Sequence, residues 1–170
     1  NVDRFSYINL LYGYRTGDQL LIEIANRIKH RLRDKDSIYR FSGDMYVLLI
    51  RDIEDVQTVI NIVDRVFELI RTPFLIDDKE ITITASFGIS LYPDDGISYE
   101  NLLKNAETAL REAKHSGKNA VKFFSERMNE KATRWFILGN QLNSAIINNH
   151  LCMYYQIQVD NKTKEITGVE

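Results

Sequence analysis

The sequence predicts an α+β fold in which helices cover a mixed, mostly antiparallel central sheet. Segments with apolar residues at helical spacing alternate along the chain with short runs of β-branched and aromatic residues. Two of these runs flank a glycine-containing turn, which is typical of a β-hairpin. A third run alternates apolar and polar residues over positions 81–91, as expected of a strand with one covered face.

Two helices are expected before the hairpin. The first covers residues 4–12 and is ended by Gly13. The second begins at Thr16, because Thr16 and Gln19 have the spacing of a capping box. Its buried stripe follows a period of 3.6 and consists of Leu20, Leu21, Ile24, Ala25, Ile28 and Leu32.

The hairpin is expected to pair residues 37–40 with residues 46–50. Both runs are rich in β-branched and aromatic side chains, which favour strands. Ser42, Gly43 and Asp44 lie between them and are residue types that form tight turns.

A third helix is expected from an N-cap at Asp52 to about Ile70, and Pro73 ends that region. Its apolar positions again keep the helical period: Val56, Val59, Ile60, Val63, Val66, Phe67 and Ile70. Residues 74–76 then lead through a polar segment into the alternating strand at 81–91.

The next helix is expected to begin at an N-cap formed by Ser98 and to end at Gly117, which is placed as a C-terminal cap. Residues 119–124 follow as a strand. Beyond them the sequence predicts a helix over 125–148 and a β-hairpin of strands 151–159 and 165–169.

Composition limits the class of protein. With 170 residues, 44% of them hydrophobic, the chain can bury a core. A net charge of -2 does not favour a nucleic-acid polymer as a partner. The single cysteine and the absence of an apolar run of membrane-spanning length predict a cytoplasmic domain, free or as the cytoplasmic part of a membrane-anchored protein. Because Asn1 is expected within a strand, the chain is interpreted as a piece of a longer protein.

Several short motifs resemble, in order and spacing, the GGDEF family of diguanylate cyclases. In the first eighteen residues these are Asn1-Val2-Asp3-Arg4-Phe5, Ile8-Asn9, Gly13-Tyr14 and Thr16-Gly17-Asp18. The turn that names the family is written here Ser42-Gly43-Asp44-Met45-Tyr46. The resemblance covers residues 1–124 and implies a nucleotide-cyclase-like fold that joins two GTP molecules into cyclic di-GMP.

The resemblance also implies which residues hold the metal ions, and here the sequence departs from the family. Asn1 stands at the position of a metal-binding aspartate, and Met45 at that of a glutamate. Asp44 keeps its acid, and Asp3 is the other carboxylate nearby. Mg²⁺ prefers anionic oxygen ligands, so the site at Asn1, Asp3 and Asp44 is expected to be weak or lost. Asp44 also fits a turn residue that bonds its own backbone.

The resemblance places guanine recognition at Asn9 and Asp18, since a carboxylate accepts hydrogen bonds from the N1 and N2 hydrogens of guanine. From the residues alone, Asn9 also fits a helix C-cap and Asp18 a first-turn acid. The resemblance also implies that phosphates are contacted by the backbone N–H groups of Ser42 and Gly43 and by the side chains of Lys114 and Lys118. Mg²⁺ is expected as a cofactor only if nucleotide binding is retained.

Arg33 and Asp36 have the register of the inhibitory cyclic di-GMP site of the family. An arginine at such a site reads and stacks on guanine, while the aspartate accepts from the base. An ordinary charged helix end explains the same residues.

The last part of the chain resembles the opening of an EAL domain, the family of cyclic di-GMP phosphodiesterases. The resemblance rests on Tyr154-Tyr155-Gln156 and on Gly168-Val169-Glu170, with Ile157 in place of a usual proline. It divides the chain into a GGDEF domain at 1–124 and an EAL fragment at 125–170. The exposed apolar tail also makes a homodimer an expectation.

Three functions follow from these patterns. The first is a degenerate, inactive GGDEF domain that binds GTP or cyclic di-GMP and regulates the EAL phosphodiesterase of the same polypeptide. The second is a working diguanylate cyclase that tolerates the changes at Asn1 and Met45. The third is a dimerisation module that binds no nucleotide.

Overall fold

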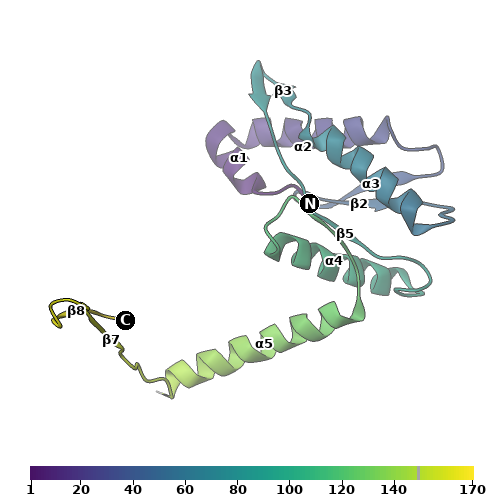
Figure 1. Cartoon of the computed structure of the whole chain (residues 1–170). Helices are drawn as coiled ribbons and strands as arrows, with labels where there is room; N and C mark the ends of the chain where they lie inside the picture. Colours follow the sequence, from purple (N-terminus) through teal and green to yellow (C-terminus); the bar gives the residue numbers. More distant parts are fainter. Residues whose placement is uncertain (149) are drawn as a thin grey trace. The chain divides into compact units, whose positions relative to one another are not determined.

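A computed structural model describes residues 1–148 and 150–170 (Figure 1). The chain forms two compact units, Asn1–Met128 and Asn129–Glu170. The helices of the first unit are α1 (Phe5–Tyr12), α2 (Tyr14–Lys29), α3 (Val56–Arg71) and α4 (Tyr99–His115). Its strands are β1 (Ser37–Ser42), β2 (Met45–Leu49), β3 (Phe74–Ile76), β4 (Lys79–Ile81), β5 (Phe87–Ile89) and β6 (Val121–Phe123). Helix α5 (Glu126–Ile147) leads into the second unit, which contains β7 (Ile157–Val159) and β8 (Ile166–Val169).

The strands of the first unit pair in both directions. β1 with β2 and β3 with β4 are antiparallel, while β5 and β6 are parallel. Val2 forms an antiparallel bridge with Ala85 and so brings the start of the chain beside the segment before β5. In Figure 1, α1 and α2 lie on one side of these strands and α4 on the other. The predicted α+β architecture, mixed and mostly antiparallel, is confirmed.

The hydrophobic core lies between α2, α3 and the strands. It is built from the predicted stripes, since Leu20, Leu21, Ile24 and Ile28 of α2 are almost fully buried. They meet residues of α3 and of the strand segments: Val66, Ile70, Phe74, Ile76, Ile81, Ile83 and Ala85. Each large aliphatic side chain buried there contributes roughly 1.5–3 kcal/mol.

Arg27 joins α2 to the end of α3. Its guanidinium donates hydrogen bonds to the carbonyl oxygens of Leu69, Thr72 and Pro73. It also stacks 3.5 Å from the centre of the Phe74 ring. Carbonyl groups at a helix C-terminus lack partners within the helix, so a basic side chain that reaches them stabilises that end.

Two predicted helix starts are wrong. Helix α2 begins at Tyr14, and its N-cap, Gly13, makes no side-chain cap bond. Thr16 lies buried inside the first turn, where its hydroxyl is not at the cap position. Helix α3 is capped by Asp55, whose side chain accepts from the backbone N–H of Thr58, rather than by Asp52.

The predicted strand over residues 81–91 is divided, and the segment before it is a second hairpin. β3 and β4 pair across the turn Asp77-Asp78, in which both residues have positive φ, 48° and 61°. This is the backbone of a tight hairpin turn, which acidic residues tolerate. The sequence therefore placed the strand start too late and missed a turn without glycine.

The cap predictions for α4 are confirmed. The side chain of Ser98 accepts from the N–H of Asn101, and Gly117, with a φ of 118°, follows the C-cap residue Ser116. Two residues of positive φ, Lys118 and Asn119, then turn the chain toward β6.

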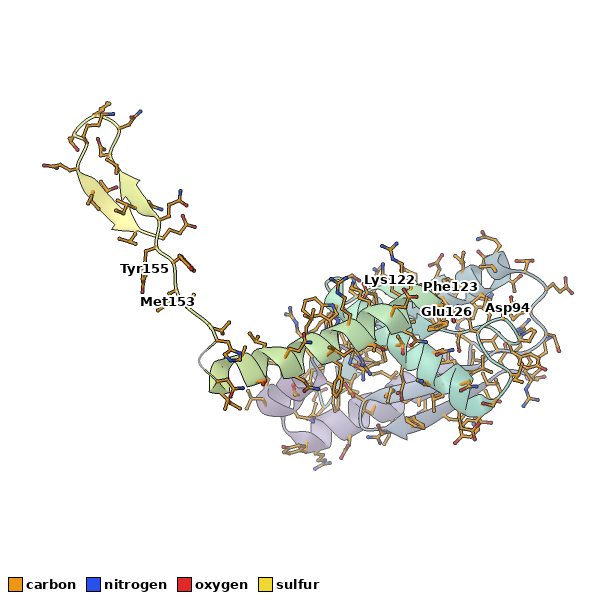
Figure 2. The ribbon with its side chains drawn as sticks, turned by 90° about the horizontal axis from the view of Figure 1, so that it is seen from below. Asp94, Lys122, Phe123, Glu126, Met153 and Tyr155 are labelled. Carbon is orange, nitrogen blue, oxygen red and sulfur yellow. The ribbon has the colours of Figure 1, made fainter. Side chains whose placement is uncertain are left out.

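In the second unit, the predicted helix and hairpin turn are confirmed. The carboxylate of Asp160 accepts from the N–H groups of Lys162 and Thr163 and so closes the turn between β7 and β8. The first strand begins at Ile157 rather than at 151. Met153 and Tyr155, on the segment before it, are exposed (Figure 2). Over residues 1–148 and 150–170, we find no helix with the length and apolar character of a membrane span.

Gly88 permits the close approach of α4 to β5. A Cβ at this position would collide with the carbonyl oxygen of Ala106 and the backbone of Leu110. We expect Gly88→Ala to lower the free energy of unfolding by about 1–3 kcal/mol through overpacking. Urea denaturation measures this effect. The control is Gly139→Ala on α5, where an added Cβ meets nothing within 4 Å. Equal stability of the two variants would contradict the predicted contact.

Candidate functional site

The candidate site is built around the first residues of the chain, which pair on two sides. The backbone nitrogen of Asn1 donates to Ser86 O at 3.0 Å, and Ser86 N donates to Asn1 O at 2.9 Å. Asp3 N donates to Thr84 O at 2.8 Å. On the other side, Val2 N donates to Asp44 O at 3.1 Å. These bonds bring Asn1 next to the hairpin turn.

The turn between β1 and β2 consists of Gly43 and Asp44. Gly43 has a φ of 52°, a left-handed conformation that glycine adopts without strain. Arg40 Nε donates a hydrogen bond to the carbonyl oxygen of Gly43 at 2.9 Å. Ser42 belongs to strand β1 and lies outside the left-handed position of the turn, so a side chain is tolerated there.

Tyr46 anchors the hairpin to α2. Its hydroxyl donates to the carbonyl oxygen of Leu21 at 2.7 Å, and burial raises the pKa of the phenol to about 12. The aromatic residue after Met45 therefore points into the core, while alternation along β2 directs Met45 to the opposite face.

Asn1 and Asp44 contact each other directly. Asn1 Nδ2 donates to Asp44 Oδ1 at 2.8 Å. Burial first and the charge of Lys114 second lower the pKa of the Asn1 amino group to about 6. The fold thus brings two of the predicted site residues, Asn1 and Asp44, into contact.

Asp3 has a different environment. Its carboxylate is 5% exposed and accepts from the hydroxyls of Thr84 (2.9 Å) and Ser86 (2.8 Å) and from the N–H of Asn119 (2.9 Å). Both carboxylate oxygens are used in these bonds. The carboxylate holds the start of the chain, the segment before β5 and the loop after α4 together.

Thr84, Ser86 and Asn119 are therefore polar partners that the sequence analysis did not single out. The signal was present in the alternation over 81–91, where the hydroxyl residues occupy one face. That face was assigned to the polar side of a strand, whereas Ser86 is fully buried against Asp3.

The residues predicted to read guanine lie on the paired helices α1 and α2. A Cβ at Gly17 would collide with Asn9 Oδ1 and with the ring of Phe5, so the glycine lets the amide of Asn9 lie against α2. The neighbouring residue, Asp18, is exposed on α2. Asn9 Oδ1 is buried and has no hydrogen-bond partner among the described residues. The backbone carbonyl oxygen of Asn9 accepts a hydrogen bond from Gly13 N, as expected at the end of a helix.

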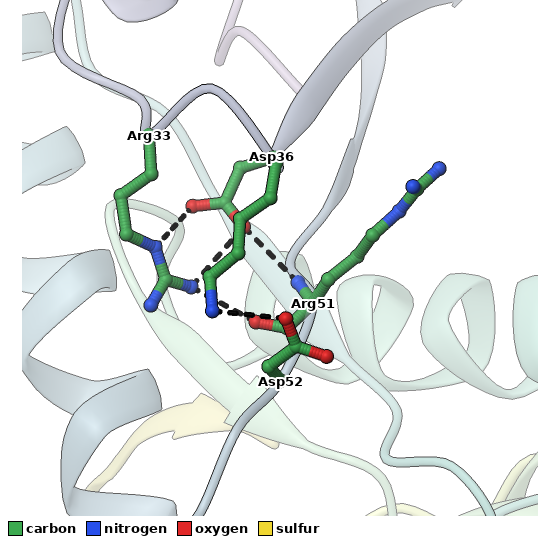
Figure 3. A network of polar contacts seen from close by, with 5 residues as sticks. Arg33, Asp36, Arg51 and Asp52 are labelled. Atoms are coloured by element: carbon green, nitrogen blue, oxygen red, sulfur yellow. Dashed lines mark hydrogen bonds and ion pairs between the residues drawn. The ribbon is translucent and has the colours of Figure 1, made fainter.

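Arg33 and Asp36 form a bidentate ion pair (Figure 3). Arg33 Nε and Nη2 lie 2.7 and 3.1 Å from the two carboxylate oxygens, and the Asp36 side chain is only 2% exposed. Both residues also bond the backbone of Arg51, which ties the end of α2 to the end of β2. Burial alone would raise the pKa of Asp36, but the hydrogen bonds from Arg33 and Arg51 lower it below its ordinary value. The neighbouring pair of Lys35 and Asp52 is exposed.

The donor set beside the turn does not fit a pair of Mg²⁺ ions. Mg²⁺ demands near-octahedral coordination by hard oxygens, and a thioether such as Met45 is a poor ligand for it. Asp44 is hydrogen-bonded to Asn1, and Asp3 uses both oxygens elsewhere. In the part of the chain that the structure describes, no three His, Cys, Asp or Glu residues converge.

A cleft of about 280 Å³ lies elsewhere, between α1 and residues 81–84. Its walls are formed by Arg4, Tyr7, Leu11, Tyr12 and Thr82, among others. Of the predicted site residues, only Asp3 lines it. The cleft is therefore separate from the surface on which Asn9, Asp18 and Lys114 were predicted to act.

Curated relatives match over nearly the whole chain. The bifunctional diguanylate cyclase/cyclic di-GMP phosphodiesterase MucR of Pseudomonas aeruginosa is 36% identical over 170 residues, which is 100% of this chain and 25% of that protein. The cyclic di-GMP phosphodiesterase NbdA of the same organism is 36% identical over 156 residues, 92% of this chain and 20% of that protein. The chain thus spans a quarter or less of the length of these relatives.

Solved structures share the fold. The GGDEF domain of TpbB (YfiN) from Pseudomonas aeruginosa superposes with a TM-score of 0.75 at 26% identity, covering 78% of each chain. An EAL/GGDEF domain protein from M. capsulatus gives a TM-score of 0.69 at 37% identity, covering 74% of this chain and 81% of that one. Residues 1–120 match the family described as "Diguanylate cyclase, GGDEF domain". This match covers more than half of the sequence, and the chain therefore belongs to the GGDEF domain family.

Proposed function

We propose that this chain is a degenerate GGDEF domain of a cyclic di-GMP signalling protein that binds a guanine nucleotide without cyclising it. The observation that carries the proposal is the hydrogen bond between Asn1 and Asp44. It occupies the place where the family resemblance implies that carboxylates hold the catalytic metal ions. The domain would act in the cytoplasm as a regulator of an EAL phosphodiesterase in the same polypeptide.

The loss of charge explains why cyclisation fails. An attack of a 3′-hydroxyl on an α-phosphate depends on divalent metal ions that neutralise the triphosphate and lower the pKa of the hydroxyl. The changes to Asn1 and Met45 remove two carboxylates that the family motif supplies. At about 3 kcal/mol for each lost electrostatic contribution, the transition state is destabilised by several kcal/mol. The reaction is then slower by several orders of magnitude.

Guanine recognition is supported by the contact of α1 with α2. Gly17 allows Asn9 to lie against α2 next to Asp18, and an exposed carboxylate can accept from two N–H groups of guanine. Asn9 Oδ1 lies buried against Gly17 and has no partner among the described residues. The phosphates would meet Lys114, Lys118 and the backbone N–H groups of Ser42 and Gly43.

The second unit supports the regulatory part of the proposal. It contains α5 from Asn129 onward and the hairpin of β7 and β8. Tyr154, Tyr155 and Gln156, directly before β7, resemble the start of an EAL domain. Trp135 and Phe136 of α5 are 66% and 71% exposed, so apolar surface remains for a partner. That partner is, in our proposal, the EAL domain that follows. The same exposed surface also favours the alternative of a homodimer.

Cyclase activity is the first test. We expect the protein incubated with GTP and Mg²⁺ or Mn²⁺ to form no cyclic di-GMP, because too few anionic ligands remain. Chromatography of the nucleotides measures the product, and a known GGDEF cyclase serves as the positive control. Formation of cyclic di-GMP at a rate typical of an active cyclase would refute the proposal and favour the second function.

Nucleotide binding is the second test. A ligand present at 100 times its dissociation constant stabilises the folded state by about 2.7 kcal/mol. We expect GTP to raise the melting temperature of the wild type and Asp18→Asn to abolish this increase, because the amide cannot accept two guanine hydrogen bonds. Asp64→Asn, an exposed acid on α3, is the matched control and should keep the response. No response to GTP, GDP or cyclic di-GMP in the wild type would favour the dimerisation module.

A mutation of the ion pair of Arg33 and Asp36 can show whether these residues form a structural contact or an inhibitory nucleotide site. The pKa of Asp36 is below its ordinary value near 3.8, so its contribution to stability is full above that pH and is lost at lower pH. We expect Asp36→Asn to cost about 2 kcal/mol at neutral pH and progressively less below pH about 4.

Chemical denaturation across this pH range measures the effect. The control is Asp52→Asn, which removes an exposed ion pair and should cost less than about 1 kcal/mol. A loss of cyclic di-GMP binding in Asp36→Asn without a loss of stability would instead support the inhibitory site.

A further inference from the structure

We infer that the cleft between α1 and residues 81–84 is a second binding site, for an uncharged aromatic compound that carries oxygen acceptors. Its volume is about 280 Å³. Sites for drug-sized ligands typically have about 300–1,000 Å³, so a compound of one or two fused rings is the size that fits.

One face of α1 forms the first wall of the cleft. Arg4, Tyr7, Ile8, Leu11 and Tyr12 line it and follow each other at helical spacing. Ile8 is 9% exposed and belongs to the core, whereas Tyr7 and Leu11 keep 61% and 72% of their surface exposed. An aromatic ligand would cover part of this apolar surface and could pack against the tyrosine rings.

The opposite wall is the chain segment that follows β4. Ile81 and Ile83 of this wall are buried in the core, at 3% and 4% exposure. Asp3 N donates to Thr84 O at 2.8 Å, and Arg4, with a φ of 55°, then turns the chain into α1, which begins at the next residue. Both walls therefore belong to hydrogen-bonded segments, and a preformed site loses little entropy when a ligand binds.

The polar groups that remain for a ligand are mainly donors. The guanidinium of Arg4 and the hydroxyls of Tyr7, Tyr12 and Thr82 can donate. In the described part of the chain, no hydrogen bond or ion pair holds these four side chains. The carboxylate of Asp3 already accepts three hydrogen bonds. Free donors favour a ligand with oxygen acceptors, such as an aromatic ketone.

The charges nearest the cleft oppose one another. Arg4 stands next to the buried carboxylate of Asp3. At the other end of α1, Lys79 Nζ lies 5.8 Å from the ring centre of Tyr12, and Lys79 is flanked in sequence by acids on both sides. A charged ligand would lose hydration without a net attraction in return, so an uncharged one is favoured.

A ligand in the cleft would also act on the candidate nucleotide site, and this part of the inference rests on the proposed nucleotide binding. Asp3 and Thr84 line the cleft and bond each other, which holds the segment that carries Asn1. The same helix, α1, presents Asn9 against Gly17 of α2. A ligand that contacts both walls favours this arrangement of α1, so we expect it to tighten GTP binding.

Nuclear magnetic resonance titration of the full chain with 2-acetylnaphthalene tests the site. We expect saturable shifts of the backbone amides of Tyr7, Leu11 and Thr82. Leu11→Gln should weaken binding at least about fivefold, because the polar side chain does not replace the apolar contact. The matched control is Leu10→Gln. Leu10 is 79% exposed on the same helix and does not line the cleft, so the affinity should stay within about twofold.

The charge of the ligand and its coupling to nucleotide have separate readouts. 2-Naphthoate has the same rings and a negative charge, and it should bind no more tightly than the ketone. Saturating GTP should tighten ketone binding at least about threefold, and by thermodynamic reciprocity the ketone should tighten GTP binding by the same factor.

The absence of saturable shifts, or equal losses of affinity in Leu11→Gln and Leu10→Gln, would overturn the site. So would a mass that doubles with concentration in light scattering and stays monomeric in Leu11→Gln, because a second copy would then occupy the cleft. Binding of 2-naphthoate more than about tenfold tighter than the ketone would overturn the uncharged ligand. Ketone affinity that does not change when GTP binds would overturn the coupling. Failure of GTP to bind would refute the proposed function, whereas the titration with the ketone alone would still decide the site.

Discussion

The buried carboxylate of Asp3 is the contact on which the arrangement of the site depends. It accepts hydrogen bonds from Thr84, Ser86 and the backbone of Asn119, three groups that are far apart in sequence. A buried charge is costly unless all its lone pairs are used, so this set of bonds permits few alternative arrangements. It fixes the first segment against the middle of the sheet and against the loop after α4. Without that fixed point, Asn1 would not meet the hairpin turn.

The helices and the core were largely predictable, because their signals are local. The stripes of α2 and α3 give the core directly, and Ser98 caps α4 as expected. The starts of α2 and α3 were not predictable in the same way. Thr16 and Asp52 are plausible caps in sequence, but burial of Thr16 and the better placement of Asp55 decided the outcome. The hairpin at Asp77-Asp78 was missed since its turn lacks the glycine that usually marks this conformation.

The contact between Asn1 and Asp44 could not be read from the sequence. Family motifs point to both residues separately, and the fold brings them together. The direct bond from Asn1 to Asp44 depends on the tertiary pairing of the first segment, which no local pattern contains. The same limit applies to Arg33 and Asp36, whose spacing is visible in the sequence, whereas their shared contact with the backbone of Arg51 is a property of the fold.

The face of β2 on which Met45 lies has a consequence for the history of such domains. Ser42 and Met45 contribute neither a required backbone conformation nor a residue of the central core, which depends on the opposite face of the hairpin through Tyr46 and Leu48. Mutations at these two positions can therefore accumulate without loss of the core contacts that Tyr46 and Leu48 make. An ancestral enzyme of this architecture can lose its chemistry in single steps while its scaffold stays intact, available for selection in a purely allosteric role.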